Sequence, residues 1–480
     1  MRALAPLFFA GLVLASCKSS SPAPSGGAPR TDPDGVHVEG TAFRDGRGRQ
    51  LLFRGMNAKV AGVFDVSFTD GRAPNYTFAS FDEAAATRFE ELGMNALRLP
   101  MSWSALEPQP LAYSETFFQE LASVLDMARR HHFYVVLDMH QDAYSKEIGE
   151  DGAPLWAIVP PPAKLLGGPS DDSRRLTQPV LDAGFNFFAN ATATDGRPLE
   201  DAFVAAVRAI ATRVAGDPAV LGFEAFNEPV VLQPDELDSF HALFADGVHA
   251  IDRDAPVLFE PVATRNQTDQ ARIPEAPWDH GPGVYAPHVY TGQFSIPSQN
   301  GWESEDPAKL APSMQAAGAE AAAWGTPLFV GELGCDQSIA RGPKWLAAEL
   351  DVQDAQLASS TAWVWADAGA GTWGLVDPSG AERPATAKAL SRSFPRAIAG
   401  DLLAIERPAP GRLHVRYRAT ARTRGLAHEV SVSTAFVASY AVTCDGAPVT
   451  ATPAPGRATF VCPDGGDGEH AFDVDGVLAP

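Results

Sequence analysis

The stretch Leu221-Gly-Phe-Glu-Ala-Phe-Asn-Glu-Pro229 decides the fold of this chain. The apolar run from Val220 to Phe226 predicts a short buried strand. The strand stops at Asn227-Glu228-Pro229, because proline has no N–H to donate and disfavours helical geometry in the residue before it. A carboxylate therefore stands at the C-terminal tip of a buried strand, beside an amide that can hydrogen-bond a hydroxyl group. In a parallel α/β barrel, this end of the strands carries the chemistry.

Seven further apolar runs accompany this strand, and amphipathic segments separate them. The eight runs cover residues 51–57, 94–100, 133–140, 220–226, 256–261, 283–290, 327–332 and 361–366. Apolar residues at helical spacing mark the segments 81–92, 117–128, 202–214, 234–251, 307–324 and 344–357. Eight strands alternating with helices predict an α/β fold, the (β/α)8 TIM barrel. A doubly wound open sheet is the alternative, but no GxGxxG motif follows any of these strands.

The rest of the chain predicts the domain organisation. We assign residues 36–396 to the barrel domain, in which residues 36–50 carry a hairpin signal and form a lid over the bottom of the barrel. Residues 141–198 break the alternation and are predicted to be a long loop on the active face. From residue 397 to 480, apolar and polar residues alternate, which predicts a small all-β sandwich domain. The sandwich lacks an obvious aromatic stripe, so we expect a docking or stabilising role for it.

Composition excludes several classes of function. With 480 residues and 45% hydrophobic side chains, the chain can bury a large core. Its formal net charge of -22 argues against a nucleic-acid partner. None of the cysteines has zinc-type spacing, and we expect no cofactor and a monomer. Cys444 and Cys462 share one β-rich stretch and either form a disulfide or remain independent thiols.

The amino terminus has the features of an export signal. A basic start is followed by the apolar residues 4–15, which are far fewer than the ~20 needed to span a membrane. The predicted signal, residues 1–17, ends in Leu14-Ala-Ser-Cys17, which resembles a bacterial lipobox whose cysteine becomes lipidated. A soluble secretory signal cleaved near the same residues is the alternative. Residues 18–35 predict a flexible Ser/Pro/Gly linker. We therefore expect an exported protein, either a lipoprotein on the cell envelope or a secreted one.

Two glutamates stand at the ends of predicted strands. Glu228 ends the fourth strand and Glu332 ends the seventh, so their carboxylates can face each other across the barrel mouth. Two carboxylates about 5–5.5 Å apart perform retaining glycoside hydrolysis, one as nucleophile and the other as general acid and then base. The acid must stay protonated near neutral pH, which partial burial and the charge of its partner favour.

Other residues at the strand ends fit supporting roles. Arg98 can orient the nucleophile through paired hydrogen bonds, and Tyr290 can bond the same carboxylate. Asn227 can hold a sugar 2-hydroxyl, and Trp365 offers a flat apolar face to a sugar ring. A single strand-end residue is more often part of the scaffold, so the argument depends on the whole set.

A metal site is the competing chemistry at this end of the barrel. Asp138, His140 and His288 supply side chains of the types that bind metals. Their spacing is common by chance, however, and no HExxH motif accompanies them. The sequence therefore predicts a site without metal.

These residues resemble glycoside hydrolase family 5, whose members are retaining enzymes on a (β/α)8 barrel. The resemblance covers residues 36–395 and rests on an ordered set: Leu97-Arg-Leu-Pro100, His140, Asn227-Glu-Pro229, His288-x-Tyr290, Gly331-Glu-Leu-Gly334 and Trp365. It implies that Glu228 is the acid/base and Glu332 the nucleophile.

Within the family, the chain is most similar to the endoglycoceramidase group. Arg54-Gly-Met-Asn-Ala-Lys59 resembles its first-strand motif, and Leu137-Asp-Met-His-Gln-Asp-Ala-Tyr-Ser145 resembles its third-strand motif. One departure is that Ala58 alone separates Asn57 from Lys59, where a polar run is expected. The resemblance implies a β-sandwich after the barrel and cleavage between glycan and ceramide in glycosphingolipids. It also implies that the glycan is contacted by Lys59, Asp138, His140, Asn227 and Tyr290.

Two other functions stay open at this point. A β-glucanase or β-glucosidase of the same family would use the same carboxylates on soluble β-glycans. An inactive, surface-bound glycan-binding lipoprotein would keep the barrel without catalysis. The apolar side chains between Trp156 and Phe188, with Val63-Phe64 and Phe294, could line a groove for an acyl chain or could be ordinary loop packing.

Overall fold

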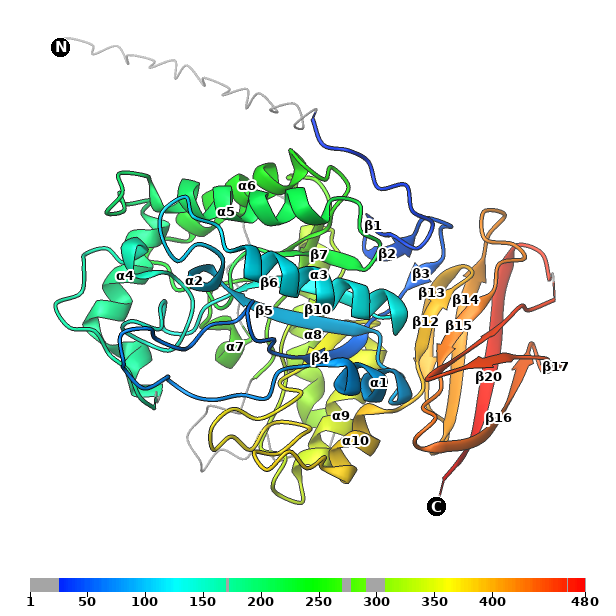
Figure 1. The fold of residues 1–480 in the computed structure, drawn as a ribbon. Coiled ribbons are helices and arrows are strands. Elements are labelled where there is room, and N and C mark those ends of the chain that lie inside the picture. The colour runs from blue at the N-terminus through cyan, green and yellow to red at the C-terminus, as the bar shows by residue number, and fades with distance from the viewer. Residues whose placement is uncertain (1–25, 170–171, 270–277, 291–306, 464, 480) are drawn as a thin grey trace, which may run out of the picture.

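The computed structural model describes residues 26–169, 172–269, 278–290, 307–463 and 465–479 (Figure 1). The predicted signal peptide with Cys17, residues 18–25 of the linker, and Phe294 lie outside the described residues. Among the described residues, no helix is both long enough and apolar enough to cross a membrane.

Eight parallel strands form one sheet at the centre of the molecule (Figure 1). They are β4 (Arg54–Asn57), β5 (Ala96–Ser102), β6 (Tyr134–His140), β7 (Val220–Glu224), β8 (Val257–Phe259), β9 (Gly283–Tyr285), β10 (Phe329–Val330) and β11 (Ser359–Ala362). The order in the sheet is β10-β11-β4-β5-β6-β7-β8-β9. A parallel bridge between Tyr285 and Leu328 brings β9 next to β10 and closes the circle. The predicted (β/α)8 barrel is confirmed.

Helices follow most of the strands and cover the outside of the barrel (Figure 1). The longer ones are α1 (Glu83–Glu91), α3 (Glu115–Arg130), α5 (Leu199–Val214), α6 (Pro234–His249), α8 (Pro307–Trp324) and α9 (Gly342–Ala355), and the shorter ones are α2 (Trp103–Leu106), α7 (Arg265–Thr268) and α10 (Pro384–Leu390). Local sequence sets several of their starts. Asp82 caps α1 by accepting a hydrogen bond from the Ala85 N–H, and Ser114 caps α3 in the same way through Phe117.

Strand β7 is shorter than the sequence predicts. It ends at Glu224, so Asn227 and Glu228 lie on the loop that follows it. Glu228 has a φ of 45°, in the left-handed region, which cannot continue a strand. The apolar residues Ala225 and Phe226 extended the predicted strand because they are buried, although they are not paired in the sheet.

The excursion after β6 is more ordered than predicted. It contains two short 3-10 helices (Leu155–Ala157 and Asp172–Leu176) and the helix α4 (Gln178–Phe188). Its aromatic residues Trp156, Phe187 and Phe188 are buried. Phe187 and Phe188 pack against Phe226 after β7 at ring distances of 5.0 and 5.2 Å. These residues therefore do not form the acyl groove considered above, and ordinary core packing is the correct explanation for them.

The predicted lid closes the N-terminal end of the barrel. It consists of β1 (Val36–Glu39), β2 (Ala42–Asp45) and β3 (Gln50–Leu51). Val36 and Phe43 share one buried cluster with residues from the N-terminal halves of the barrel strands, among them Val136 and Leu221. The same strands also begin a seven-stranded antiparallel sheet, in the order β1-β2-β3-β12-β15-β19-β18. The lid and the C-terminal region are therefore parts of one sheet.

A five-stranded antiparallel sheet packs on this sheet and completes the sandwich (Figure 1). The strands involved are β12 (Pro395–Ile398), β13 (Asp401–Glu406), β14 (Arg412–Ala419), β15 (His428–Ser431), β16 (Val437–Cys444), β17 (Ala447–Val449), β18 (Thr452–Ala454), β19 (Arg457–Phe460) and β20 (Gly468–Leu478). The five-stranded sheet has the order β13-β14-β20-β16-β17. The boundary that we place after residue 396 falls within β12, which pairs with β3 on one side and β15 on the other.

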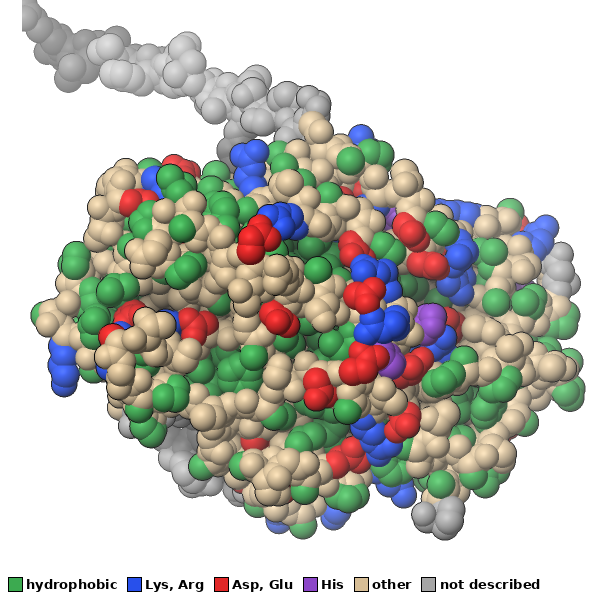
Figure 2. Space-filling model, in the orientation of Figure 1, with side chains coloured by type: hydrophobic (Ala, Val, Ile, Leu, Met, Phe, Trp, Pro, Cys, Tyr) green, Lys and Arg blue, Asp and Glu red, His purple; other side chains and the backbone are tan. Residues whose placement is uncertain are grey.

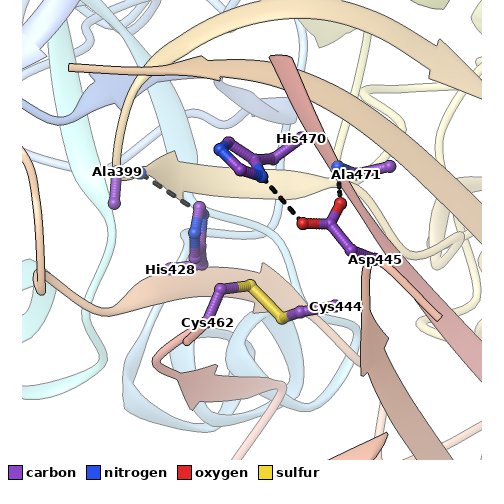
Figure 3. Close-up of a disulfide and its surroundings, with 7 residues drawn as sticks. All are labelled: Ala399, His428, Cys444, Asp445, Cys462, His470 and Ala471. Carbon is purple, nitrogen blue, oxygen red and sulfur yellow. Dashed lines mark hydrogen bonds and ion pairs between the residues drawn. A yellow bond between two sulfur atoms is a disulfide. The ribbon is translucent and has the colours of Figure 1, made fainter. Parts of the chain in front are cut away.

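A disulfide between Cys444 and Cys462 ties the two sheets together (Figure 3). Cys444 ends β16 in one sheet, and Cys462 follows β19 in the other. The bridge closes a loop with a sequence separation of 18 residues. A loop of this length corresponds to about 3 kcal/mol of stabilisation in the chain-entropy picture.

The sandwich docks on helix α1 of the barrel. Arg457 on β19 forms an ion pair with Glu90 at 2.9 Å, and the Ser433 hydroxyl donates to the Glu91 carbonyl at 3.0 Å. Gly456 approaches the Glu90 carbonyl so closely that a Cβ there would lie 1.7 Å from its oxygen. On the face shown in Figure 2, acidic and basic side chains gather in a mixed band between the barrel and the sandwich.

Candidate active site

Arg98 on β5 is the centre of a buried polar cluster at the C-terminal end of the barrel. Its guanidinium donates to Glu332 Oε1 at 2.7 Å and to Glu224 on β7 at 2.7 and 3.1 Å. It also donates to Asn227 Oδ1 at 2.8 Å and Asn57 Oδ1 at 2.9 Å. The rigid fork of an arginine suits such a set of acceptors, because its five N–H groups point in fixed directions.

Glu332 follows β10 and is held by two donors. Oε1 accepts the hydrogen bond from Arg98, and Oε2 accepts one from the Tyr290 hydroxyl at 2.9 Å. The side chain is 7% exposed. Since both oxygens accept hydrogen bonds, the surroundings favour the carboxylate form that a nucleophile needs.

Glu228 lies on the loop after β7 and is the more exposed of the two carboxylates, at 21%. Its Oε1 accepts a hydrogen bond from Asn266 at 2.9 Å and lies 2.9 Å from His288 Nδ1. Its Oε2 has a longer contact, 3.9 Å, with Arg175. Its backbone N–H donates to Glu260 at 3.2 Å. The carboxylate is thus oriented through Oε1, and Oε2 is the oxygen available to a substrate.

The two carboxylates lie close together, with His288 between them. One oxygen of each and one nitrogen of His288 all lie within 4.8 Å of one another. His288 Nδ1 is 2.9 Å from Glu228 Oε1 and 3.5 Å from Glu332 Oε2. Retaining glycosidases hold their carboxylates about 5–5.5 Å apart, whereas inverting enzymes need about 6.5–9.5 Å. The spacing matches the retaining arrangement.

His288 controls the charge of this pair. Burial acts to lower the pKa of His288, but the charges of Glu260 and Glu332 outweigh it, and the pKa lies well above its ordinary value. Burial acts to raise the pKa of Glu228, but the hydrogen bond and charge of His288 outweigh it, so this pKa lies below its ordinary value. The sequence argument for a protonated acid at Glu228 took no account of His288.

Burial raises the pKa of Glu332, against the opposing charges of His288 and Arg98. Taken alone, the two pKa shifts would place a shared proton on Glu332. An acid at Glu228 needs the reverse order, with the higher pKa and the proton on Glu228. The hydrogen bonds favour the reverse order, because donors reach both oxygens of Glu332, whereas both donors to Glu228 reach Oε1 and leave Oε2 for a proton. A sugar bound over Glu228, the more exposed group, would also remove its water and raise its pKa.

A second group of polar and aromatic side chains adjoins the carboxylates. His140, at the end of β6, lies 2.7 Å from Asp138 Oδ2 through Nδ1 and stacks on Trp363 with ring centroids 5.6 Å apart. Lys59 Nζ lies 5.0 Å from the centroid of the same Trp363 ring and donates to the Tyr76 hydroxyl at 3.2 Å. Asp138 is fully buried beneath His140, so we expect it to act on a ligand through that imidazole.

The prediction for Trp365 is wrong. Trp365 is 6% exposed and packs edge-on against Phe81 and near Phe89, with ring centroids 5.3 and 5.9 Å away. Trp363 is the tryptophan that adjoins His140 and Lys59. The prediction placed Trp365 within the eighth strand, residues 361–366, whereas β11 ends at Ala362 and both tryptophans follow it.

A cleft of about 560 Å³ begins beside these side chains. Its walls include Phe64, Tyr76 and Phe78. Among the lining residues that the structure describes, Asp65 is the one with a charged side chain. Phe64 and Tyr76 are the rings that lie over Lys59, at 5.0 and 4.6 Å. The volume is within the range of small-molecule sites, and the aromatic walls suit the flat faces of sugar rings.

Three groups of side chains in the described residues are compact enough to surround a cation. They are His140, Asp142 and Asp151; Glu224, Glu260 and His288; and Glu228, His288 and Glu332. In each group a guanidinium already contacts a carboxylate: Arg175 contacts Asp142, and Arg98 contacts Glu224 and Glu332. Asp138 belongs to none of these groups. We therefore assign no metal ligand.

Sequence reasoning missed several residues of this cluster. Glu224 interrupts an apolar strand, and Glu260 precedes a proline just as Glu228 does, so both carried a readable signal. Asn266, Tyr76 and Trp363 carried none, because Asn266 lies in the short helix α7 and the other two on loops, all of which only the fold brings to the barrel mouth.

Comparisons with known proteins agree with this geometry. The family model described as Cellulase (glycosyl hydrolase family 5) matches residues 57–369. The chain belongs to glycoside hydrolase family 5. It is 30% identical over 292 residues to Endoglycoceramidase I of Rhodococcus hoagii, covering 56% of this chain and 55% of that protein. It is 30% identical over 243 residues to Glucosylceramidase of Aspergillus fumigatus, covering 40% of this chain and 32% of the other.

The alignments thus span about half, or less, of the lengths of these curated relatives. Endo-glycoceramidase II from Rhodococcus sp., solved as a ganglioside GM3 complex, has the same fold. It superposes with a TM-score of 0.75 at 23% identity, covering 92% of this chain and 100% of that one. The resemblance to family 5 and to endoglycoceramidases that the sequence predicts is confirmed.

Proposed function

We propose that this protein is a retaining β-glycosidase that cleaves the bond between glycan and ceramide in glycosphingolipids. The spacing of Glu228 and Glu332 carries the proposal, because their oxygens lie within 4.8 Å of each other in a buried site. We propose Glu332 as the nucleophile and Glu228 as the acid/base. The hydrogen bonds from Arg98 and Tyr290 to Glu332 support this division, as does the greater exposure of Glu228.

In the first step, a Glu332 oxygen forms a bond to the anomeric carbon as the glycosidic bond breaks. The departing oxygen takes the proton of Glu228, and the positive charge of the transition state develops beside the carboxylates. In the second step, a water molecule gives a proton to Glu228 and attacks the anomeric carbon, which releases Glu332. Two displacements at the same carbon return the original configuration. We expect Asn227, His140 and Lys59 to hold the sugar during both steps.

Two observations support a lipid-linked leaving group. The relatives are named for enzymes that act on glycolipids, endoglycoceramidase and glucosylceramidase. Apolar side chains are also exposed just after the acid/base, since Val230 and Leu232 are 47% and 61% exposed. The leaving group departs on the side of the residue that protonates it, so these side chains suit the lipid portion of the substrate. Phe64 lines the cleft described above, whereas Trp156, Phe187 and Phe188 are buried in the core.

Hydrolysis of soluble β-glycans is the second candidate function. The matching family model is described as Cellulase, and the cleft of about 560 Å³ could take a chain of neutral sugars. A glycan-binding lipoprotein without activity would have no need for the two carboxylates with their complete set of donors. The catalytic proposals are therefore the ones to test first.

The deciding assay offers the purified protein both glycosphingolipids and soluble β-glucans. We expect release of the intact oligosaccharide and of free ceramide from the glycosphingolipid. Turnover of soluble glucan alone would overturn the ceramide proposal and leave the glycosidase proposal standing. Absence of turnover on both substrates would overturn both.

For location, we propose an exported lipoprotein anchored to the cell envelope through Cys17, with the soluble secreted form as the alternative. The lipobox-like ending of the predicted signal supports the anchor. Mass spectrometry of the mature amino terminus tests it. A lipid-modified Cys17 is expected, and a mature chain that begins beyond Cys17 would establish soluble secretion.

A further inference from the structure

Glu260 is a buried carboxylate that the proposed mechanism leaves without a role. It follows β8 and is almost completely inaccessible. Its Oε2 accepts a hydrogen bond from the backbone N–H of Glu228 at 3.2 Å. Its Oε1 lies 3.3 Å from His288 Nε2 and 3.4 Å from Arg98 Nη2. Glu260 therefore reaches Glu228 by two routes, through its backbone and through His288.

Two of the three contacts of Glu260 named above, the Glu228 N–H and the Arg98 guanidinium, are donors in every protonation state, and the third is the ion-pair contact with His288 Nε2. Burial raises the pKa of Glu260, and the charge of Glu224 acts in the same direction, against His288 and Arg98. A protonated carboxyl needs an acceptor for its hydrogen, however, whereas a backbone N–H, an imidazole nitrogen and a guanidinium surround these oxygens. A carboxylate at Glu260 accepts from the fixed donors and faces a doubly protonated His288 across 3.3 Å, where the contact with Nε2 is an ion pair without hydrogen-bond geometry.

The charged groups around the His288–Glu260 pair come from several elements. Arg98 approaches from β5, Glu224 from the end of β7, and Glu332 from the loop after β10. Asp142 and Arg175 lie on the far side of Glu228 and contact each other at 2.6 Å. The carboxylates that face His288 from three sides thus support a positive imidazolium at the centre of the site.

The two oxygens of Glu228 are not equivalent. Oε1 is occupied by two nitrogens, from Asn266 and His288, each at 2.9 Å. An oxygen that receives two donors has no direction left for a hydrogen of its own. The acid proton must then sit on Oε2, the oxygen that can face a leaving group. This holds only while His288 Nδ1 carries a hydrogen.

We propose that Glu260 is a positioning residue for the acid/base: by keeping His288 protonated on both nitrogens, it reserves Oε1 of Glu228 as an acceptor and places the catalytic proton on Oε2. The inference rests on the proposed roles of Glu228 and Glu332. Without the charge of Glu260, His288 can become neutral and lose the hydrogen on Nδ1. Nδ1 then accepts from Glu228, and the acid proton moves to Oε1, away from the departing oxygen.

Two substrates that differ in how far their leaving groups need protonation can distinguish this positioning role from a purely structural one. A dinitrophenolate leaves without protonation, whereas a phenolate depends on the acid, so 2,4-dinitrophenyl and phenyl β-lactosides serve as the paired probes. For Glu260→Gln we expect kcat/KM on the phenyl lactoside to fall at least about tenfold, part of the 10²–10⁴-fold that general acid catalysis contributes. The value on the dinitrophenyl lactoside should stay within about threefold of the unmodified protein, because that step needs no acid.

Glu224→Gln is the matched control. Glu224 is equally buried and contacts Arg98, but among the described residues it forms no hydrogen bond with Glu228 or His288. Glu224 also faces His288 within 4.8 Å, but its hydrogen bonds go to Arg98, which holds the nucleophile, so its loss should lower the rates on both lactosides and not the phenyl rate alone. A Glu260→Gln protein that also loses both activities equally would overturn the proposal, since it would then be only a scaffold residue. If the unmodified protein turns over neither lactoside nor glycolipid, the proposed function fails instead.

The state of His288 can be read directly by nitrogen NMR of selectively ¹⁵N-histidine-labelled protein, with His288→Asn used to assign its signals. We expect both ring nitrogens of His288 to be protonated near neutral pH and one of them to lose its hydrogen in Glu260→Gln. Identical His288 signals in the two proteins would overturn the proposal even if the rates differ.

Discussion

Replacing Tyr290 by phenylalanine keeps the ring and removes the hydrogen bond that its hydroxyl donates to the proposed nucleophile. The hydroxyl donates to Glu332 Oε2 at 2.9 Å, and the buried ring lies 5.7 Å from Trp373, a contact that phenylalanine keeps. Hydrogen bonds to a charged group contribute about 1.5–3 kcal/mol. If the bond holds the attacking oxygen in line with the anomeric carbon, and so contributes that much more in the transition state than in the free enzyme, losing it should lower kcat/KM by about 10- to 150-fold.

The pH dependence gives this prediction a sign. Glu332 must be ionised to attack, and the hydroxyl favours the ionised form, so its removal raises the pKa of Glu332. Activity is lost as the pH falls through that raised pKa, and the acid limb of kcat/KM moves to higher pH. The shift should be about one pH unit for each 1.4 kcal/mol of lost interaction.

The assay measures kcat/KM for the two aryl β-lactosides across pH. Because the lost bond serves the nucleophile, both substrates should slow by the same factor, in contrast to Glu260→Gln. An unchanged acid limb together with an unchanged kcat/KM would refute the reasoning that Tyr290 supports Glu332. A loss confined to the phenyl lactoside would instead assign the hydroxyl to the acid side of the site.

Three further substitutions test the site and the fold. Glu332→Gln should lower turnover by about 10⁴-fold or more while glycan binding, followed by calorimetry, persists; a near-normal rate would remove Glu332 from the mechanism. Trp365→Ala should lower the free energy of unfolding, measured in denaturant, by about 3–5 kcal/mol. Trp363→Ala should mainly raise KM. The opposite pattern would show that Trp365, and not Trp363, contacts the sugar. Gly456→Ala should lower the free energy of unfolding by at least about 1–2 kcal/mol, because the φ of 63° at this residue is left-handed. The close Glu90 carbonyl should add to the loss. An unchanged unfolding midpoint would contradict the docking of the sandwich on helix α1.

Much of the barrel could be predicted because its signals are local. A buried parallel strand is a short apolar run wherever it occurs, and proline or polar residues end it. Glu228, Glu332, Arg98 and Tyr290 stand next to such ends, so counting strands placed them on one rim. The structure brings them together, with Arg98 and Tyr290 on the same carboxylate.

The structural features that could not be predicted from the sequence depend on contacts between distant segments of the chain. Nothing in residues 36–51 shows that they share a sheet with residues 395–460, because edge strands alternate in the same way whichever partner they find. The excursion after β6 looked irregular since its apolar residues serve several neighbours at once, as Phe187 does with Phe226 and Phe240. Trp363 and Trp365 both follow β11, and only their packing separates them, since Trp363 stacks on His140 and Trp365 packs against Phe81.

Glu228 and Glu260 show where local reasoning stops. Each follows an aromatic-containing apolar run and precedes a proline, so the two positions are alike in sequence. Their environments differ because Glu228 lies on a loop with a φ of 45°, which turns its side chain toward the mouth of the barrel, while Glu260 directly follows its strand and is buried. One carboxylate thus becomes the exposed partner of Glu332, and the other a fixed counter-charge for His288. The division of labour between them is set by the backbone after β7, so exchanging the two loops, rather than the two side chains, would be needed to exchange their roles.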